Sequence, residues 1–372
     1  MRSVYQSEPQ ETVLFHGPNR IGLGHLNRLS AIALALKKKS PHVRPLFAVE
    51  GGAHVILEAV RLPFVPLPSE YLMYQTGHWD DWNKGRRTSL ALDMCRSLLA
   101  ATDPGIVVID CYPSLALGTA TLEKGTPIVL CLRAMKDVET HLSRLRRILP
   151  AVELIILPHD PGAMTLPGEF EDKACFVGQI VRPGLSGAGE LPAKKRPLIV
   201  ISGGGGGYPE TVDFYNFAAQ AVSDLKTQYA DCECRLITGP LFEDWLALRP
   251  APGVSVIPYD PDVRNTFAGA DLVICQAGYN TVAELECIGT KTILVPAPRA
   301  LDDQFARARQ VAQTNRRFRS YEGNSPAELA QVALSLLNAE VIGAPQDLPQ
   351  GAVRAAEKLA GILRSRSVAA FA

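Results

Sequence analysis

The amino-acid sequence predicts an α/β protein built on two doubly wound parallel sheets. Short apolar runs alternate with helical stretches along most of the chain, a pattern typical of parallel sheets. The length of 372 residues exceeds one ordinary core and suits two domains of roughly 150 to 180 residues. A stretch rich in Pro, Gly, Ala and Lys, without apolar periodicity, separates the two series of runs. We therefore expect two Rossmann-like domains.

The expected boundaries follow from these runs. We expect a first Rossmann-like domain at 1–180, a linker at 181–197, a second Rossmann-like domain at 198–345 and a C-terminal helical segment at 346–372. Lys plus Arg equals Asp plus Glu at 38 each, so the overall charge does not favour a nucleic-acid partner. The sequence shows neither a signal peptide nor an apolar run long enough to span a membrane. These features predict a cytoplasmic protein with a small partner, and they are compatible with peripheral contact with a membrane.

The first domain begins with a strand at residues 12–16 and a turn that contains Gly22 and Gly24. Further strand-like runs lie at 45–49, 64–67, 106–109, 128–132 and 154–157. The two glycines permit close approach of another molecule, and His25 opens a helix that reaches about Lys39. The positive end of the helix dipole disfavours an imidazolium and leaves a ring that can accept a proton. Taken alone, these residues favour a structural role for this histidine.

Asp110 closes the apolar run at 106–109 and is expected at the same edge of the sheet as His25. Its carboxylate would orient the histidine, or it would cap the turn at Pro113 and Ser114. An irregular loop contains Tyr74, Trp79 and Trp82. These aromatic residues suit an acceptor site, and they suit a lid packed on its own domain equally well.

The second domain begins with an apolar strand at 198–202, followed by five glycines: Gly203, Gly204, Gly205, Gly206 and Gly207. They form either a flexible turn or a backbone surface against a pyrophosphate or sugar. Asp260-Pro261-Asp262 is similar to an Asp-x-Asp metal motif. We set that reading aside because Asp262 is expected to cap a helix that starts near Val263. No metal is expected.

The segment from Asp271 to Gln304 predicts a strand, a tight turn at Ala277 and Gly278, a helix, a second strand and a turn into another helix. Backbone N–H groups at a helix start can bind a phosphate at the carboxyl end of a strand. Asn280 and Glu284 are four residues apart and share one helix face. An ionised carboxylate such as Glu284 accepts hydrogen bonds and suits the hydroxyl groups of a ribose.

The run Ala-Gly-Tyr-Asn-Thr-Val-Ala-Glu at 277–284, with a later Pro-x-Pro loop and Asp-Asp-Gln, resembles the nucleotide-sugar site of GT-B glycosyltransferases. The likeness is strongest to the family of the bacterial N-acetylglucosaminyltransferase that completes lipid II. Gly22-Leu23-Gly24-His25 matches the turn that carries the catalytic base in that family. The resemblance implies two domains that face each other across a cleft and a C-terminal helix that crosses back to the first domain.

The resemblance further implies an inverting, metal-independent transfer from a nucleotide diphosphate sugar, expected to be a UDP-sugar, to a hydroxyl of a small-molecule or lipid-linked acceptor. His25 would be the base and Asp110 its orienting acid. The implied donor-binding residues are Gly203, Gly204, Gly205, Gly206, Gly207, Tyr259, Gln276, Ala277, Gly278, Asn280, Thr281, Glu284, Asp303 and Gln304. The implied acceptor-binding residues are Gly22, Gly24, Tyr74, Trp79 and Trp82. Asp303 replaces the usual Gln of the family, so N-acetylglucosamine is not assigned as the donor sugar.

Two alternatives remain open at this stage. Nucleotide-sugar hydrolases of the pseudaminic acid pathway share the Gly-x-Gly-His turn, and in this chain His25 would then activate water. A non-catalytic protein that binds a sugar nucleotide is the other alternative. It predicts that loss of His25 leaves the function intact.

Overall fold

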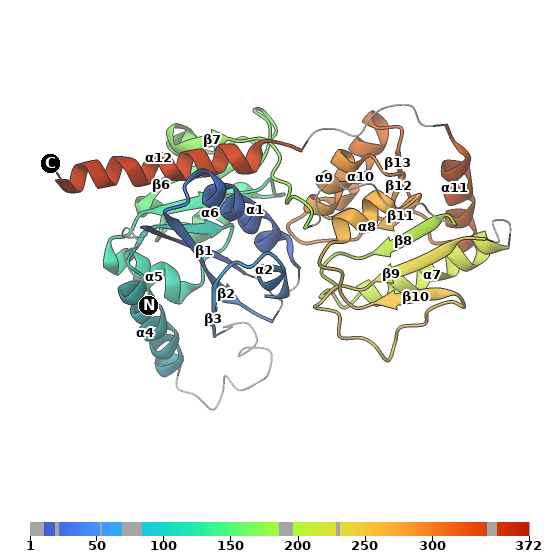
Figure 1. Ribbon diagram of the computed structural model, residues 1–372, viewed down its shortest axis with the longest axis horizontal. Coiled ribbons are helices and arrows are strands. Elements are labelled where there is room, and N and C mark those ends of the chain that lie inside the picture. Colours follow the sequence, from blue (N-terminus) through green and yellow to red (C-terminus); the bar gives the residue numbers. More distant parts are fainter. Residues whose placement is uncertain are drawn as a thin grey trace, which may run out of the picture. The chain divides into compact units, whose positions relative to one another are not determined.

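The chain divides into two compact units in the computed structural model. The structure describes residues 11–18, 22–52, 54–68, 84–185, 196–227, 231–340 and 348–371. One unit comprises Met1–Arg20, His25–Arg182 and Pro349–Ala372, and the other comprises Ile21–Gly24 and Pro183–Leu348 (Figure 1). Tyr74, Trp79 and Trp82 lie outside the described residues, as does most of the expected linker.

The first unit contains a seven-stranded sheet in the order β3-β2-β1-β4-β5-β6-β7, in which every pair of neighbours is parallel. The strands are β1 (Glu11–Pro18), β2 (Val43–Glu50), β3 (Phe64–Leu67), β4 (Pro104–Asp110), β5 (Ile128–Cys131), β6 (Val152–Leu157) and β7 (Ala174–Phe176). Alternate residues of β4 enter different cores, with Val108 in one and Val107 in the other. A strand covered on both faces reads as a continuous apolar run, which is why β4 was predictable.

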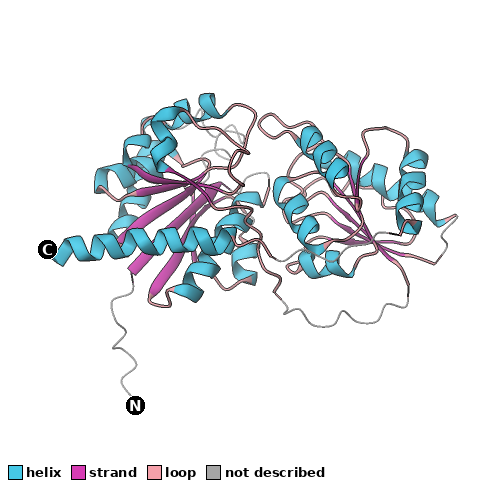
Figure 2. Cartoon of the chain, turned by 90° about the horizontal axis from the view of Figure 1, so that it is seen from above, coloured by secondary structure: helices cyan, strands magenta, loops and turns pink. Residues whose placement is uncertain are grey.

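Helices cover both faces of this sheet, as Figure 2 shows. One core is lined by α1 (Gly24–Lys39), α2 (Val55–Ala59) and α12 (Gly351–Phe371). The other is lined by α4 (Lys84–Thr102), α5 (Leu115–Lys124) and α6 (Val138–Leu145), with short 3₁₀ turns at Leu149–Ala151 and Gly168–Lys173. Leu359 and Leu363 of α12 belong to the same buried cluster as Leu29 and Ile32 of α1. The last described helix of the chain therefore completes the core of the first unit.

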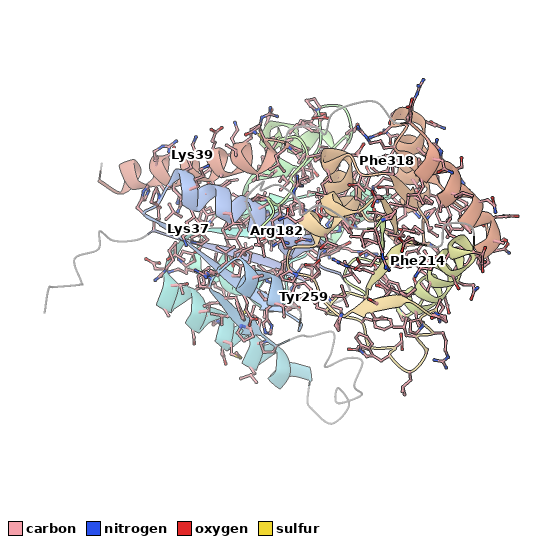
Figure 3. All side chains as sticks on the ribbon, turned by 45° about the vertical axis from the view of Figure 1, so that its right-hand side comes forward. Lys37, Lys39, Arg182, Phe214, Tyr259 and Phe318 are labelled. Carbon is pink, nitrogen blue, oxygen red and sulfur yellow. The ribbon has the colours of Figure 1, made fainter. Side chains whose placement is uncertain are left out.

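The second unit contains a six-stranded parallel sheet in the order β10-β9-β8-β11-β12-β13. Its strands are β8 (Leu198–Ser202), β9 (Glu233–Ile237), β10 (Val254–Ile257), β11 (Leu272–Cys275), β12 (Thr292–Leu294) and β13 (Phe318–Ser320). Its helices are α7 (Thr211–Lys226), α8 (Val263–Gly269), α9 (Tyr279–Ile288), α10 (Gln304–Thr314) and α11 (Pro326–Asn338). Phe214 lies in the core beneath α7 and α11, and Phe318 lies in the core beneath α8, α9 and α10 (Figure 3).

The predicted fold class is confirmed, since both sheets are parallel, flanked by helices and centred on predicted strands. Two strands, β7 and β13, were not predicted. Each has three residues and lies at a sheet edge. β13 (Phe-Arg-Ser) contains no apolar run, and the apolar run of β7 (Ala-Cys-Phe) is short and half-buried.

The cysteines form no disulfides, and most of them are buried. All eight cysteines are free; seven are buried and Cys175 is half-buried. Burial raises the pKa of the Cys234 thiol to about 12, which favours the unreactive protonated form. Among the described helices, none is long and apolar enough to cross a membrane.

Candidate active site

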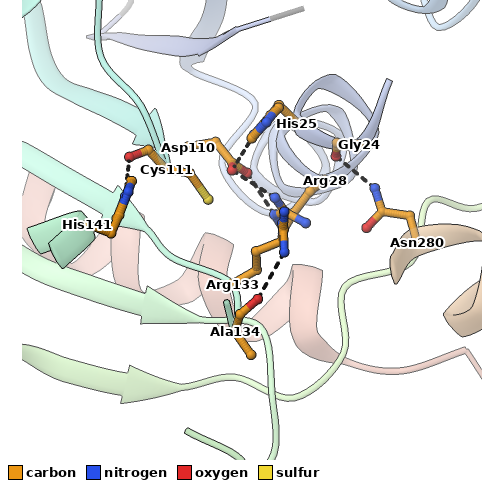
Figure 4. A network of polar contacts seen from close by, with 9 residues as sticks. All are labelled: Gly24, His25, Arg28, Asp110, Cys111, Arg133, Ala134, His141 and Asn280. Atoms are coloured by element: carbon orange, nitrogen blue, oxygen red, sulfur yellow. Dashed lines mark hydrogen bonds and ion pairs between the residues drawn. The ribbon is translucent and has the colours of Figure 1, made fainter. Parts of the chain in front are cut away.

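His25 and Asp110 meet at the carboxyl edge of the first sheet (Figure 4). β1 and β4 are adjacent parallel strands, so the turn into α1 and the end of β4 open at the same edge. His25 is the second residue of α1, and Asp110 is the last residue of β4. Their Nδ1 and Oδ1 atoms are 2.8 Å apart. The sequence placed both residues at this edge, and the structure brings them into direct contact.

The contact determines which ring nitrogen of His25 is available. An ionised carboxylate only accepts hydrogen bonds, so Nδ1 carries the proton and donates to Asp110. Nε2 of the neutral ring is then the nitrogen that can accept a proton. The His25 side chain is 21% exposed whereas that of Asp110 is fully buried. The pair therefore has the orientation expected of a general base held by a buried acid.

Arg28 completes this cluster and was not predicted from the sequence. Its Nε donates to Oδ2 of Asp110 at 2.7 Å, and its Nη2 donates to Oδ1 at 2.8 Å. The arginine lies one helical turn after His25, and both side chains of the ion pair are almost completely inaccessible. The only signal in the sequence was the spacing of three between His25 and Arg28, which puts both on one face of α1.

The charge state of Asp110 follows from these partners. Burial alone would raise its pKa, but the charge of Arg28 and the hydrogen bonds from His25 and Arg28 hold the pKa well below its ordinary value. Asp110 is therefore a carboxylate across the physiological pH range. It cannot take the proton from His25, and it holds the ring through the hydrogen bond at Nδ1.

The turn after Asp110 is held by two other histidines. Cys111 has a left-handed φ of 59°, and its carbonyl oxygen accepts from Nε2 of His141 at 2.9 Å. His16 accepts at Nε2 from the backbone N–H of Ser114, at 3.1 Å. Ser114 caps α5 with its own hydroxyl, which accepts from Leu117 N. The alternative that Asp110 caps this turn is therefore wrong, because Ser114 does so and the Asp110 carboxylate is committed elsewhere.

His25, Asp110 and Cys111 place one potential metal-ligating atom each within 4.8 Å of one another. Two properties of this donor set disfavour a cation. Arg28 already donates to both carboxylate oxygens of Asp110. Burial, and then the neighbouring Asp110 charge, raise the pKa of the Cys111 thiol to about 12, so the thiolate that a metal needs is disfavoured. The set suits proton transfer better than metal binding.

In the second unit, the glycine loop follows β8. A Cβ atom at Gly203 would clash with the hydroxyl group of Tyr215, and one at Gly206 would clash with the carbonyl oxygen of Thr238. These two glycines are therefore required by packing within the unit itself. Gly204 has a left-handed φ of 77° and open space where its Cβ would lie. Gly205 and Gly207 are half-buried.

The turn between β11 and α9 has the predicted form. Ala277 is fully buried, and Gly278 is the N-cap of α9 without a side chain to satisfy the first N–H groups of the helix. Thr281 is half-buried in the first turn, and Glu284 is buried one turn later. The side-chain amide of Asn280 donates to the carbonyl oxygen of Gly24, which groups with the second unit.

Two arginines that were not predicted contact this turn, Arg299 from the loop between β12 and α10 and Arg307 from α10. Arg299 Nη2 donates to Oε1 of Gln276 at 3.0 Å. Arg307 Nη1 donates to the carbonyl oxygen of Ala277 at 2.8 Å, and the same guanidinium binds Asp302. No spacing rule reveals the Arg299–Gln276 and Arg307–Ala277 contacts, because Gln276 and Ala277 follow β11 whereas both arginines follow β12 in the chain.

Asp303 and Gln304 take different positions at the start of α10. Asp303 is exposed and caps the helix, with its Oδ1 accepting from Ala306 N at 3.0 Å. Gln304 is buried, and its Oε1 accepts from Ala297 N at 3.1 Å. Asp303, which replaces the usual Gln of the family, therefore caps α10.

Tyr259 is half-buried in the loop after β10. The capping bond predicted from the Asp262 side chain to α8 is not formed. Asp262 occupies the N-cap position but makes no capping bond to α8, and its carboxylate accepts from Leu185 N and Asn265 Nδ2. Asp260 instead accepts from Asp262 N and from the Thr266 hydroxyl. Both carboxylates are therefore used to shape the loop.

Comparison with known proteins places the chain among glycosyltransferases. Residues 198–341 match the model of the Glycosyltransferase family 28 C-terminal domain. Over 302 residues, the chain is 27% identical to the UDP-N-acetylglucosamine--N-acetylmuramyl-(pentapeptide) pyrophosphoryl-undecaprenol N-acetylglucosamine transferase of Acetivibrio thermocellus. That match covers 74% of this chain and 75% of the relative.

Solved structures share the fold across almost the whole chain. Acinetobacter baumannii MurG superposes with a TM-score of 0.52 at 16% identity, covering 95% of this chain and 99% of that chain. Staphylococcus aureus MnaA in complex with UDP superposes with a TM-score of 0.63 at 12% identity, covering 96% of each chain. The chain thus carries a Glycosyltransferase family 28 C-terminal domain and is similar over about three quarters of its length to the Acetivibrio thermocellus transferase, while the solved structures show that it shares their fold.

Proposed function

We propose that this protein transfers a sugar from a UDP-sugar to an acceptor hydroxyl with inversion at the anomeric carbon. The observation that carries the proposal is the His25–Asp110 contact, which orients an imidazole for proton abstraction. The donor assignment is supported by the Acetivibrio thermocellus relative, whose name specifies UDP-N-acetylglucosamine. Its name also specifies a pyrophosphoryl-undecaprenol acceptor, which supports a lipid-linked acceptor here and a reaction at a membrane surface.

The chemistry is a single displacement. Nε2 of His25 takes the proton of the acceptor hydroxyl as the acceptor oxygen forms its bond to the anomeric carbon. The bond from that carbon to the diphosphate oxygen breaks, and its electron pair leaves with UDP. Asp110 remains ionised and stabilises the imidazolium that forms, while Arg28 holds the Asp110 carboxylate in place.

Peptide N–H groups stabilise the departing diphosphate in this proposal. Gly278 leaves the first N–H groups of α9 without intrahelical acceptors, and Gly204 offers open space beside the glycine loop. Such donors are oriented before the reaction and need no reorganisation as charge develops. The scheme therefore assigns leaving-group stabilisation to backbone donors of the second unit and requires no metal ion.

Glu284 binds the ribose, and Tyr259 lies beside the uracil in this scheme. Substituting Glu284 with glutamine is expected to weaken UDP binding about 10- to 100-fold, because a hydrogen bond to a charged group contributes about 1.5–3 kcal/mol. Calorimetric titration with UDP and 2′-deoxy-UDP measures the effect. The substitution should change UDP affinity more than 2′-deoxy-UDP affinity. An equal loss for both nucleotides would contradict the ribose assignment.

The proposal is tested by incubating the protein with UDP-sugars, with and without acceptors. Thermal-shift screening with UDP, TDP, GDP and ADP first selects the nucleotide, and stabilisation by GDP alone would contradict the assignment of Tyr259. Transfer predicts that UDP release depends on an acceptor. Rapid release of free sugar without acceptor would instead support the hydrolase alternative, in which the same histidine activates water.

A further inference from the structure

The Arg299 guanidinium is buried and contacts three side chains, those of Glu210, Tyr208 and Gln276. The side chain is 4% exposed, and its Nη1 pairs with Glu210 at the start of α7. Its Cζ lies 3.7 Å from the ring centroid of Tyr208, and its Nη2 donates to Oε1 of Gln276 at 3.0 Å. Tyr208 and Glu210 follow the glycine loop directly, whereas Gln276 precedes the N-cap of α9. Arg299 thus joins the two segments to which the proposed function assigns the diphosphate.

The bond from Arg299 fixes the orientation of the Gln276 carboxamide. The amide has an oxygen that only accepts and a nitrogen that only donates, and arginine has no acceptor. The oxygen must therefore face Arg299, which turns the NH₂ group away from it. The Gln276 side chain is buried, and within the described part of the chain its NH₂ group makes no hydrogen bond.

We propose that Arg299 is a positioning residue of the donor site, which holds Gln276 so that its NH₂ group donates to a phosphate oxygen of the bound nucleoside diphosphate. This inference rests on the proposed function and names two side chains that complete its leaving-group site. Gln276 lies two residues before the N-cap of α9, where backbone N–H groups already favour an anion. Arg307 holds the same turn through the carbonyl oxygen of Ala277.

The charges around Arg299 favour positioning over direct phosphate binding. Glu210 neutralises the guanidinium, and the flat face of Arg299 lies on Tyr208. The Gln276 amide is neutral, and the Arg299–Glu210 pair that holds it carries no net charge. The amide therefore adds a directed hydrogen bond to the phosphate. A free cation at this place would retain the UDP product strongly. Arg299 therefore acts through Gln276 and does not itself count as a catalytic residue.

The decisive variant is Gln276→Glu. A glutamate keeps the acceptor that Arg299 requires, so the fold is retained, but it replaces the donor that faces the ligand with a negatively charged acceptor. We expect UDP affinity to fall about 10- to 100-fold, as for other hydrogen bonds to charged groups, while uridine affinity and the melting temperature stay unchanged. Isothermal titration with UDP, uridine and inorganic pyrophosphate provides the measurements. Gln310→Glu, on the exposed face of α10, is the matched control for the added charge.

The role of Arg299 is tested with Arg299→Met alone and combined with Gln276→Leu. If Arg299 acts through Gln276, the double variant binds UDP no more weakly than Gln276→Leu, and Arg299→Lys recovers part of the loss. Additive losses would overturn the positioning role. Unchanged UDP affinity in Gln276→Glu would overturn the whole inference even if Arg299→Met fails to fold. Failure of the unaltered protein to bind UDP would overturn the proposed function first, and that outcome is distinct from both.

Discussion

Substitution of His25 with alanine is expected to lower kcat about 10²- to 10⁴-fold, the range that general bases contribute. The ring is the group that the Asp110 carboxylate orients, at 2.8 Å, and alanine offers no proton acceptor in its place. Donor binding should be unaffected, because every residue assigned to UDP belongs to the second unit. Turnover measured by UDP release, beside calorimetric UDP affinity, separates the two effects.

The control for this substitution is His42→Ala. His42 is exposed, so the same side chain is removed without touching the Asp110 cluster. Its kcat should match that of the unaltered protein. If His25→Ala keeps full activity, the assignment of His25 as the base fails. If both variants lose activity together with UDP binding, the loss reflects the fold and not the chemistry.

Removing one partner of the Arg28–Asp110 pair should have the largest effect on stability. Arg28→Met leaves a buried carboxylate without its main charge partner, and breaking a buried ion pair costs about 3–5 kcal/mol. Urea unfolding should show this loss. Arg28→Met combined with Asp110→Leu should be less destabilised than the sum of the single variants, because neither charge is then left unpaired. An additive double variant would contradict the coupling.

Lys39, paired with Glu357 at the surface, gives the control for this prediction. Lys39→Met should change the free energy of unfolding by about 0–1 kcal/mol.

The same pair predicts a pH dependence. The pKa of Asp110 is lower in the folded state than in the unfolded chain, where a carboxyl titrates near about 4. Its stabilising contribution is therefore complete above about pH 4 and is lost as the pH falls toward the depressed folded value. The unaltered protein should lose stability more steeply than Asp110→Asn below about pH 4. Equal slopes would show that Asp110 does not carry this dependence.

The sequence predicted best the strands and helix ends that depend on a single type of residue. The buried strands were predictable as apolar runs, and Gly278 marked the turn that begins α9. Gly289 ends this helix with a left-handed φ of 76°. His25 and Asp110 were predictable because each ends or begins an element at the carboxyl edge of the sheet. The two-domain α/β fold followed from the alternation of these elements and was confirmed, whereas its assignment to GT-B came from the resemblance of the 277–284 run.

The contacts of Arg28 and Arg299, which the sequence did not reveal, join segments distant in the chain. Arg28 reads as a polar residue of an amphipathic helix, and its burial depends on Asp110, 82 residues later. Arg299 reads as a loop residue, and its contacts with Gln276 and Glu210 come from separate strand ends. The capping bond predicted for Asp262 is not formed, and its carboxylate instead accepts from Leu185 N, 77 residues earlier, and from Asn265 Nδ2.

The place of α12 has a consequence for how the chain is made. The first unit needs Leu359 and Leu363 for its core, yet the ribosome supplies them only after the whole second unit has been synthesised. The second unit, nearly continuous in sequence, can fold as it emerges, while the nascent first unit waits with an uncovered apolar face. Chaperone demand should therefore concentrate on the amino-terminal half, and a stop codon near position 348 should yield aggregates in place of a shortened enzyme.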